Sequence, residues 1–281
     1  DSKYDLVIIG AGFTGVSASI TAAENGANVI VVDAGNPGHG ASTRNGGMLG
    51  SPHKISFIDT VEKYGEETAK KLLLEGIEGY KYTKNILTKE FKDAEFKSYG
   101  RLKLAWSKKD FLILKKDVDE AKRLANYNVE LIQPENLKDH IGSSVYYGGA
   151  LFRDHGGINP MKFHNALMRK AISLGVHFLS NKKVENILSK GIKKITIVEG
   201  KEILSEKVLI ATNGYTTSNF KFLKQRVYPV PSFIITTEPL SPEIINHISP
   251  REHMMVETRL RFCYFRLSPD RTRLIFGGRA A

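Results

Sequence analysis

The chain has 281 residues, of which 41% are hydrophobic and 25% are charged, and its formal net charge is +11. This size and composition allow one large hydrophobic core or two smaller ones and exclude an extensively disordered protein. Between residues 62 and 123 lysines alternate with acids, as is typical of solvated helix faces, so the positive charge does not indicate a nucleic-acid partner.

The N-terminal segment predicts one βαβ unit. Residues 4–9 form a short apolar run of the kind found in buried parallel strands. Residues 14–25 predict a helix, and residues 28–32 predict a second buried strand that is closed by Asp33. The glycine-rich stretch 35–50 has no periodicity, and a long loop of this kind inside a compact domain is usually functional.

The rest of the chain mixes helical and strand patterns. Helical patterns cover 56–89 and 108–126, and Asn159-Pro160 opens another helix that ends at Gly175. Two domains that exchange the chain back and forth best explain this order. The predicted strands are 97–106, 144–152, 176–188, 192–198, 207–211, 233–237, 257–267 and 273–277.

Several absences narrow the class of protein. The single cysteine, Cys263, cannot form an intrachain disulfide, and the eight histidines show no metal-ligand spacing. No apolar run reaches the roughly 18–20 residues of a membrane span, and Leu6–Ile9 is too short for a signal peptide. We therefore expect a cytoplasmic protein with no metal, no integral membrane segment and no nucleic-acid partner.

The first strand runs into a G-x-G-x-x-G motif, at residues 10–15. Gly10 allows the tight turn, Gly12 lets the backbone approach a pyrophosphate, and Gly15 lets the helix pack on the strand. Asp33 follows Gly10 by 23 residues, where an acid accepts hydrogen bonds from a ribose diol. A strand before, a helix after and an acid at this distance together predict that the unit binds the ADP half of a dinucleotide.

The glycine-rich loop carries a family resemblance. From Gly40 to Gly47 it reads GASTRNGG. This stretch resembles the D-amino-acid oxidase-like family of FAD-dependent amine oxidoreductases, of the glycine and sarcosine oxidase type, and above all its γ-glutamylputrescine oxidoreductase-like members. The resemblance implies that the loop runs under the flavin pyrophosphate and ring. Glycines permit such a close approach, Ser42 can bond a phosphate, and Arg44 can supply positive charge.

Two further segments extend the resemblance along the chain. The run 148–160 is similar to the family's return from the substrate domain, and the run 211–215 is similar to a turn whose backbone lies against the dinucleotide. Val184 matches a position whose backbone holds the adenine. The motif and the resemblance together predict these FAD-binding residues: Gly10, Gly12, Phe13, Thr14, Gly15, Asp33, Ala34, Ala41, Ser42, Arg44, Asn45, Gly46, Gly47, Val184, Ala211, Thr212 and Gly214.

The chain departs from the family pattern at two places. It ends with the run Phe276 to Ala281, where family members continue into a C-terminal segment, so we expect that part of the family fold to be missing. Some relatives tether the flavin through a histidine in the loop, near the place that Asn45 takes here. With no histidine or cysteine beside it, we expect FAD to bind non-covalently.

The resemblance implies an α/β protein in which a Rossmann-type FAD-binding domain is interleaved with an α+β substrate domain built on an antiparallel sheet. The expected FAD-binding domain comprises 1–50 and 150–225, and the expected substrate domain comprises 51–149 and 226–281.

The implied activity is oxidation of a C–N bond in an amine or amino acid, by hydride transfer to the flavin and hydrolysis of the imine. Oxygen or an electron carrier then takes the electrons, and the sequence leaves both open. A non-catalytic FAD-binding subunit of a larger complex and an NAD-linked dehydrogenase are the alternatives. No catalytic residue is fixed by the sequence. The candidates near the flavin or the substrate are Arg44, Met48, Tyr264, Arg266, Arg261 and Arg101.

Overall fold

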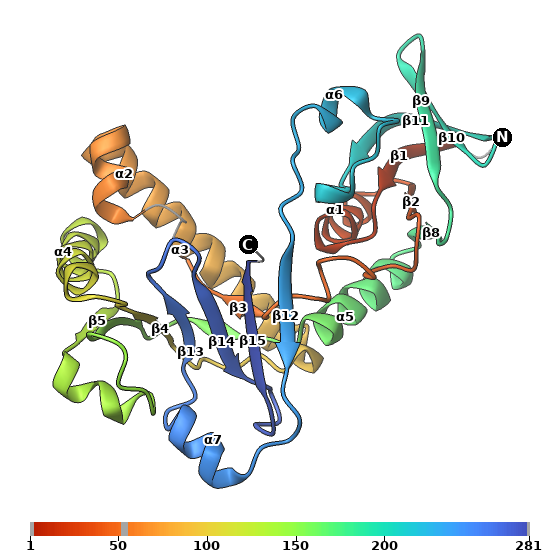
Figure 1. The fold of residues 1–281 in the computed structure, drawn as a ribbon. Helices are drawn as coiled ribbons and strands as arrows, with labels where there is room; N and C mark the ends of the chain where they lie inside the picture. Colours follow the sequence, from red (N-terminus) through yellow and green to blue (C-terminus); the bar gives the residue numbers. More distant parts are fainter. Residues whose placement is uncertain (1–2, 52–55, 280–281) are drawn as a thin grey trace. The chain divides into compact units, whose positions relative to one another are not determined.

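The computed structural model describes residues 3–51 and 56–279. The chain divides into two compact units, each built from two separate stretches of sequence (Figure 1). Unit 1 comprises Asp1–Asn45 and Pro160–Pro231, and unit 2 comprises Gly46–Asn159 and Ser232–Ala281. The last residues of the predicted C-terminal run, 280 and 281, lie outside the described residues.

Unit 1 is built on a six-stranded sheet with the order β8-β2-β1-β11-β10-β9. Its centre is parallel, because β1 pairs in parallel with both β2 and β11, and β2 pairs in parallel with β8. The strands β9 and β10 form an antiparallel hairpin, which pairs with β11. All four residues of β2 are buried, as expected for a parallel strand covered on both faces. The strands are β1 (Lys3–Ile9), β2 (Val29–Val32), β8 (His177–Leu179), β9 (Val184–Lys190), β10 (Lys193–Val198) and β11 (Lys201–Ile210).

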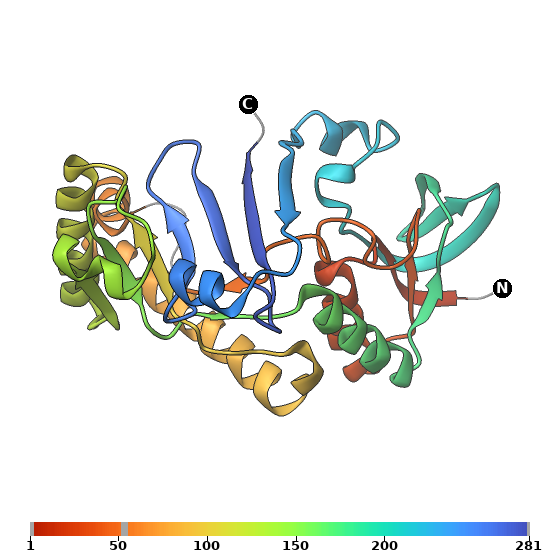
Figure 2. The ribbon, with the colours of Figure 1, turned by 60° about the horizontal axis from the view of Figure 1, so that its bottom comes forward.

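Two helices of unit 1, α1 (Phe13–Glu24) and α5 (Pro160–Ser173), pack against each other (Figure 2). Gly15 sets how closely α1 approaches β1, since a Cβ there would lie 1.9 Å from the Gly10 carbonyl oxygen. No side chain other than hydrogen fits at that position. The 3-10 turn η3 (Asn213–Tyr215) and the short helix α6 (Lys221–Lys224) follow β11.

Unit 2 is built on a seven-stranded sheet with the order β12-β15-β14-β13-β4-β6-β5. The sheet is antiparallel except for one parallel pair, β13 with β4. A separate two-stranded ribbon joins β3 (Met48–Leu49) to β7 (Gly156–Gly157). The sheet strands are β4 (Arg101–Leu104), β5 (Val129–Ile132), β6 (Gly149–Phe152), β12 (Ser232–Thr236), β13 (Met254–Glu257), β14 (Cys263–Leu267) and β15 (Leu274–Arg279).

Alternation along the strands gives the unit 2 sheet two packed faces. Leu102 and Leu104 of β4 belong to a core cluster with Phe265 of β14. On the other face, Phe152 packs with Leu73 and other residues of the covering helices. The helices of unit 2 are α2 (Phe57–Tyr64), α3 (Glu66–Lys89), α4 (Lys108–Ala125) and α7 (Pro242–Ile248), with the 3-10 helices η1 (Lys92–Ala94) and η2 (Pro134–Asp139).

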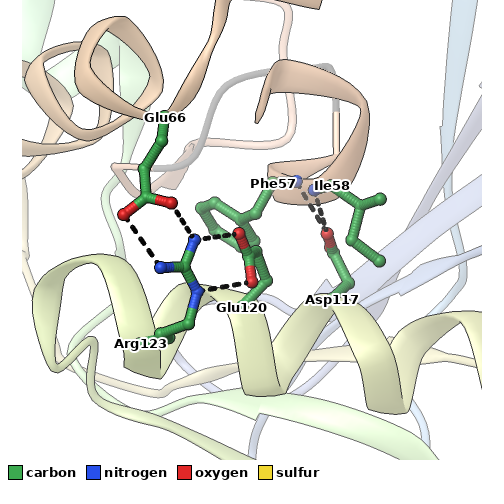
Figure 3. A network of polar contacts seen from close by, with 6 residues as sticks. All are labelled: Phe57, Ile58, Glu66, Asp117, Glu120 and Arg123. Atoms are coloured by element: carbon green, nitrogen blue, oxygen red, sulfur yellow. Dashed lines mark hydrogen bonds and ion pairs between the residues drawn. The ribbon is translucent and has the colours of Figure 1, made fainter. Parts of the chain in front are cut away.

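Side chains of α4 hold the starts of α2 and α3 (Figure 3). The Asp117 carboxylate accepts hydrogen bonds from the backbone N–H groups of Phe57, at 2.6 Å, and Ile58, at 3.2 Å. These are unpaired donors at the first turn of α2, so the buried carboxylate stabilises that end of the helix. Arg123 donates two bonds of 2.9 Å to Glu66 at the start of α3 and also bonds Glu120.

The sequence prediction of one strand over 257–267 is wrong. The strand β13 ends at Glu257, the chain turns through 258–262, and β14 begins at Cys263. The buried Glu257 carboxylate closes the turn, because it accepts hydrogen bonds from Arg259 Nε at 2.8 Å and from Cys263 N at 3.2 Å. The strand β5 and the helix α7 were not predicted at all.

Candidate functional site

A cavity of about 450 Å³ lies in unit 1, at the carboxyl ends of β1, β2 and β11. In open α/β sheets ligands bind at this end of the strands. The cavity brings together eleven of the residues predicted from sequence, although they come from five separate segments. These are Gly10, Gly12, Phe13, Thr14, Asp33, Ala34, Ala41, Ser42, Val184, Ala211 and Thr212.

The turn between β1 and α1 has the shape that close backbone approach requires. Gly10 has φ +106°, and a Cβ there would lie 2.6 Å from the Ala211 carbonyl oxygen. Gly12 lines the cavity, and a Cβ on it would lie 2.8 Å from Ser42 Oγ. A side chain at either glycine would therefore collide with the chain around the turn.

The N-terminus of α1 is prepared for an anion. Gly12 caps the helix without a side-chain bond, and the first turn holds no acidic residue. Among the described residues the Gly12 N–H has no hydrogen-bond partner, while the Phe13 N–H donates to Ser42 Oγ at 2.9 Å. The Ser42 hydroxyl keeps its own proton for donation. Free N–H groups and the positive end of the helix dipole favour a phosphate here.

Asp33 lines the same cavity from the end of β2. Its Oδ2 accepts a hydrogen bond from Ala11 N at 2.7 Å, and its Oδ1 accepts one from Gly35 N at 2.8 Å. A carboxylate has about four acceptor sites, so two remain for the hydroxyl groups of a ribose.

The loop 38–45 is tied to itself by side chains. Thr43 Oγ1 donates to the Gly38 carbonyl at 2.6 Å, and Asn45 Nδ2 donates to the carbonyls of Ala41 and Ser42 at 3.0 and 2.9 Å. These bonds hold Ser42 where it meets the turn of α1. Arg44, which the sequence placed beside the flavin, is exposed on the same loop and does not line the cavity.

The remaining predicted residues take other places. Gly15 packs α1 on β1, and Gly214 lies in η3, where a Cβ would approach Pro229 to 3.5 Å. Gly46 and Gly47 are buried residues of unit 2. There a Cβ on Gly46 would lie 3.2 Å from the ring of Tyr264, one of the candidates for substrate contact.

Arg266 is placed deep in unit 2. The residue is 3% exposed, and its Nη2 donates to the Ile158 carbonyl at 2.5 Å. The guanidinium lies directly under β7, because a Cβ on Gly157 would come within 2.1 Å of Nη1. Burial lowers the pKa of Arg266 below its usual value. This arrangement favours a role in holding the β3–β7 ribbon, rather than contact with a substrate.

The other arginines of unit 2 lie in different places. Arg101 lies on the same sheet face as Arg266, where its guanidinium stands 5.4 Å from the Phe152 ring centre and burial lowers its pKa. Arg259 and Arg261 lie in the turn that follows β13, not on a strand. Because β13 ends at Glu257 and β14 begins at Cys263, neither residue shares a strand with Arg266.

Sequence reasoning missed several residues that line the cavity. They flank predicted positions: the loop before Ala41, the residues before Val184, and the turn after Thr212. Their closeness in sequence to the predicted positions could have identified them. The missed residues include Gly38, His39, Lys182, Lys183, Thr217 and Phe220, while Gly40, Asn213 and Tyr215 lie within predicted runs but were not named singly.

The comparison with protein families decides the class. A model described as FAD dependent oxidoreductase matches residues 5–281. The chain belongs to this family. FAD is therefore its cofactor, and the predicted resemblance and α/β fold class are confirmed.

Curated relatives match along nearly the whole chain. A probable oxidoreductase OrdL from Haemophilus influenzae is 30% identical over 279 residues, which cover 97% of this chain and 64% of that protein. Gamma-glutamylputrescine oxidoreductase from Escherichia coli is 28% identical over 98% of this chain and 64% of its own length. The chain thus spans about two thirds of the length of these relatives.

Solved structures share the fold. Glycine oxidase from Geobacillus kaustophilus superposes with a TM-score of 0.78 at 18% identity, over 100% of this chain and 72% of that one. L-proline dehydrogenase from P. horikoshii gives a TM-score of 0.73 at 20% identity, over 100% of this chain and 70% of its own. Among the described residues, no helix is long and apolar enough to cross a membrane.

Proposed function

We propose that this family member binds FAD non-covalently and oxidises a C–N bond in an amine or amino acid. The observation that carries the proposal is the unit 1 cavity, where the unpaired Gly12 N–H, the Ser42 hydroxyl and the Asp33 carboxylate face one ligand-sized space. The donors suit a pyrophosphate and the acceptor suits a ribose, so the residues fit the ADP half of FAD.

Within unit 1 each group has a separate task. The N-terminus of α1, with Gly12 and Ser42, holds the pyrophosphate, and Asp33 accepts bonds from the adenosine ribose. Val184 holds the adenine through its backbone, and the stretch from Ala211 to Gly214 lies along the dinucleotide. In this assignment unit 1 is the FAD-binding domain.

Unit 2 is proposed as the substrate domain. Tyr264 and Met48 are the candidates for substrate contact there, since both lie next to Gly46: a Cβ on Gly46 would stand 3.2 Å from the Tyr264 ring and 3.9 Å from Met48 Cγ. Arg261 and Arg101 are candidates to hold a carboxylate, since a guanidinium can form two parallel bonds to it. Arg266, covered by β7, is assigned to support the ribbon that carries Met48.

The chemistry divides between the cofactor and the chain. When bound, FAD supplies the oxidation itself, by accepting a hydride from the carbon of the C–N bond and leaving an imine that water hydrolyses. The residues of the chain bind and orient the reactants and exclude water from them. The printed names of two relatives, gamma-glutamylputrescine oxidoreductase and glycine oxidase, support an amine or amino-acid substrate.

The experiment is anaerobic mixing of the flavin-loaded protein with a panel of amines, amino acids and hydroxy acids, followed by visible absorption. Bleaching of the flavin band by amines or amino acids, and its return when air is admitted, is expected of an amine oxidase. Return only after an artificial electron carrier is added would indicate a dehydrogenase. Bleaching by hydroxy acids alone would overturn the C–N assignment. A bound flavin that no substrate bleaches would favour a non-catalytic subunit, and a colourless protein that takes up no FAD would remove the proposal.

A further inference from the structure

A histidine outside the predicted set lies behind the glycine-rich turn of unit 1. His164, on α5, is 1% exposed, and its Nε2 lies 2.8 Å from the Ala11 carbonyl oxygen. A carbonyl oxygen only accepts, so Nε2 carries the proton and donates it. The other ring nitrogen, Nδ1, is buried with no hydrogen-bond partner in the described part of the chain.

This hydrogen bond fixes the direction of the next N–H group. The peptide between Ala11 and Gly12 is planar and trans, so the Gly12 N–H points opposite to the Ala11 carbonyl. Holding the carbonyl towards α5 therefore turns the N–H away from α5. Gly12 lines the cavity, and its N–H has no partner among the described residues.

The peptide on the other side of Ala11 is held as well. The Ala11 N–H donates to Asp33 Oδ2 at 2.7 Å. Ala11 is thus gripped from the end of β2 through its N–H and from α5 through its carbonyl. Each of the two bonds resists rotation of one of the peptide planes that meet at Ala11.

The same imidazole ring also packs against the loop that supplies Ser42. A Cβ on Gly38 would lie 2.7 Å from both Nδ1 and Cε1 of His164, and Gly38 has φ +78°. Thr43 bonds the Gly38 carbonyl, and the neighbouring Ser42 accepts the Phe13 N–H. The ring therefore contacts both segments that are proposed to face the phosphate: the turn, at Ala11, and the loop, at Gly38.

We propose that His164 is a positioning residue for the pyrophosphate of FAD: by holding the Ala11 carbonyl it aims the Gly12 N–H at the phosphate. The proposal rests on the proposed binding of FAD in unit 1. It goes beyond that proposal in assigning the orientation of the phosphate donor to a side chain that never meets the ligand.

The test compares two amide substitutions. In His164→Gln the amide nitrogen falls near the place of Nε2 and can still donate to Ala11. In His164→Asn the amide falls near the place of Nδ1 and cannot reach the carbonyl. Dissociation constants are measured by calorimetry on the apoprotein for FAD, for ADP, which carries the pyrophosphate, and for adenosine, which does not.

We expect His164→Asn to bind FAD and ADP roughly tenfold more weakly than the unsubstituted chain, the loss typical of one well-aimed hydrogen bond. Adenosine affinity should stay within about twofold, and His164→Gln should restore most of the ADP affinity. A second variant, Gly38→Ala, pushes on the ring without removing the donor and should also weaken ADP but not adenosine. Gly38→Ala tests the proposal if His164→Asn does not fold.

The matched control is His253→Leu in unit 2. His253 is also buried and donates, through Nδ1, to the Tyr99 carbonyl at 2.6 Å. Loss of that bond should lower the melting temperature of the apoprotein without changing ADP affinity. Equal ADP affinities for His164→Asn and His164→Gln, or equal losses for ADP and adenosine, would overturn the positioning role while leaving FAD binding intact. Failure of the unsubstituted chain to bind FAD would overturn the proposed function itself.

Discussion

The Ala11 N–H donates a 2.7 Å hydrogen bond to Asp33 Oδ2, and this bond ties the glycine-rich turn to the end of β2. Asp33 therefore bonds the protein backbone and, in the proposal above, also the ribose. The second carboxylate oxygen repeats the pattern with the Gly35 N–H at 2.8 Å. A substitution at Asp33 thus acts on the turn and on the ligand together.

Replacing Asp33 by alanine is expected to weaken FAD binding. The change removes a charge-assisted acceptor and releases the Ala11 N–H, at a cost of about 1.5–3 kcal/mol, or roughly ten- to hundredfold in affinity. Asp33→Asn keeps one acceptor oxygen, so its affinity for FAD should lie between those of the unsubstituted chain and Asp33→Ala. Fluorescence titration of the apoprotein with FAD measures the effect, and an unchanged affinity in Asp33→Ala would count against the ribose assignment.

Gly12→Val is expected to give folded protein that holds no flavin. The added Cβ would stand 2.8 Å from Ser42 Oγ, at the cavity wall where the phosphate is proposed to lie. Gly79→Ala, in α3 of unit 2, is the control, since nothing lies within 4 Å of its Cβ. That helical substitution should retain flavin and stabilise the protein by about 0.5–1 kcal/mol. Circular dichroism and the flavin-to-protein absorbance ratio test both; normal flavin content in Gly12→Val would refute the phosphate site.

The flavin is expected to leave the protein on acid precipitation. Asn45 falls near the place where the family resemblance puts a tethering histidine in some relatives, and it donates to the carbonyls of Ala41 and Ser42. Cys263, the only cysteine, lies in β14. After treatment with trichloroacetic acid the yellow colour should remain in the supernatant. Colour in the washed pellet would reveal a covalent bond.

Stability is expected to fall as the pH drops below 6.5, in part because of His155. Burial lowers the pKa of this imidazole to about 3, while in the unfolded chain it returns to about 6.5. Between these values the unfolded state binds the extra proton, so the unfolding free energy decreases with falling pH. The group contributes about 1.4 kcal/mol per pH unit, or about 2 kcal/mol between pH 6.5 and 5.

Urea unfolding at pH 7 and pH 5 measures this dependence. In His155→Gln an amide takes the place of the ring beside the Tyr127 hydroxyl, which His155 Nε2 meets at 2.9 Å. This variant should lose less stability on acidification than the unsubstituted chain. The buried pair His140 and His253, whose pKa values burial also lowers, leaves a residual slope in both proteins. An identical slope with and without His155 would contradict the assignment.

The sequence predicted those parts of the fold that depend on local order. The strand at 4–9, the glycine motif and Asp33 lie within about thirty residues, so their spacing reflects one βαβ unit directly. The turn at 258–262 escaped prediction because it contains neither glycine nor proline. A hydrogen-bonded carboxylate, that of Glu257, closes it instead, and such a contact leaves no mark in a strand pattern.

In the candidate site, too, the sequence indicates residues with fixed local spacing and does not indicate contacts between distant segments. Asp33 and Gly12 have fixed spacings in a known motif, whereas His164 meets Ala11 across 153 positions of sequence. Nothing in the helix pattern of α5 distinguishes His164 from an ordinary core residue. Arg266 was named for its charge, and only the packing of Gly157 over it reveals its burial.

The division of unit 1 into two stretches affects how the unit folds during its synthesis on the ribosome. Strand β1 pairs with β11, which joins residues about two hundred positions apart, such as Ile9 and Ile210. When β1, α1 and β2 emerge, the neighbouring strands β8 and β11 have not been synthesised. Closing so long a loop carries an entropy penalty and slows folding. The sheet that carries the cavity is therefore completed only after β11, in the second stretch, has been synthesised.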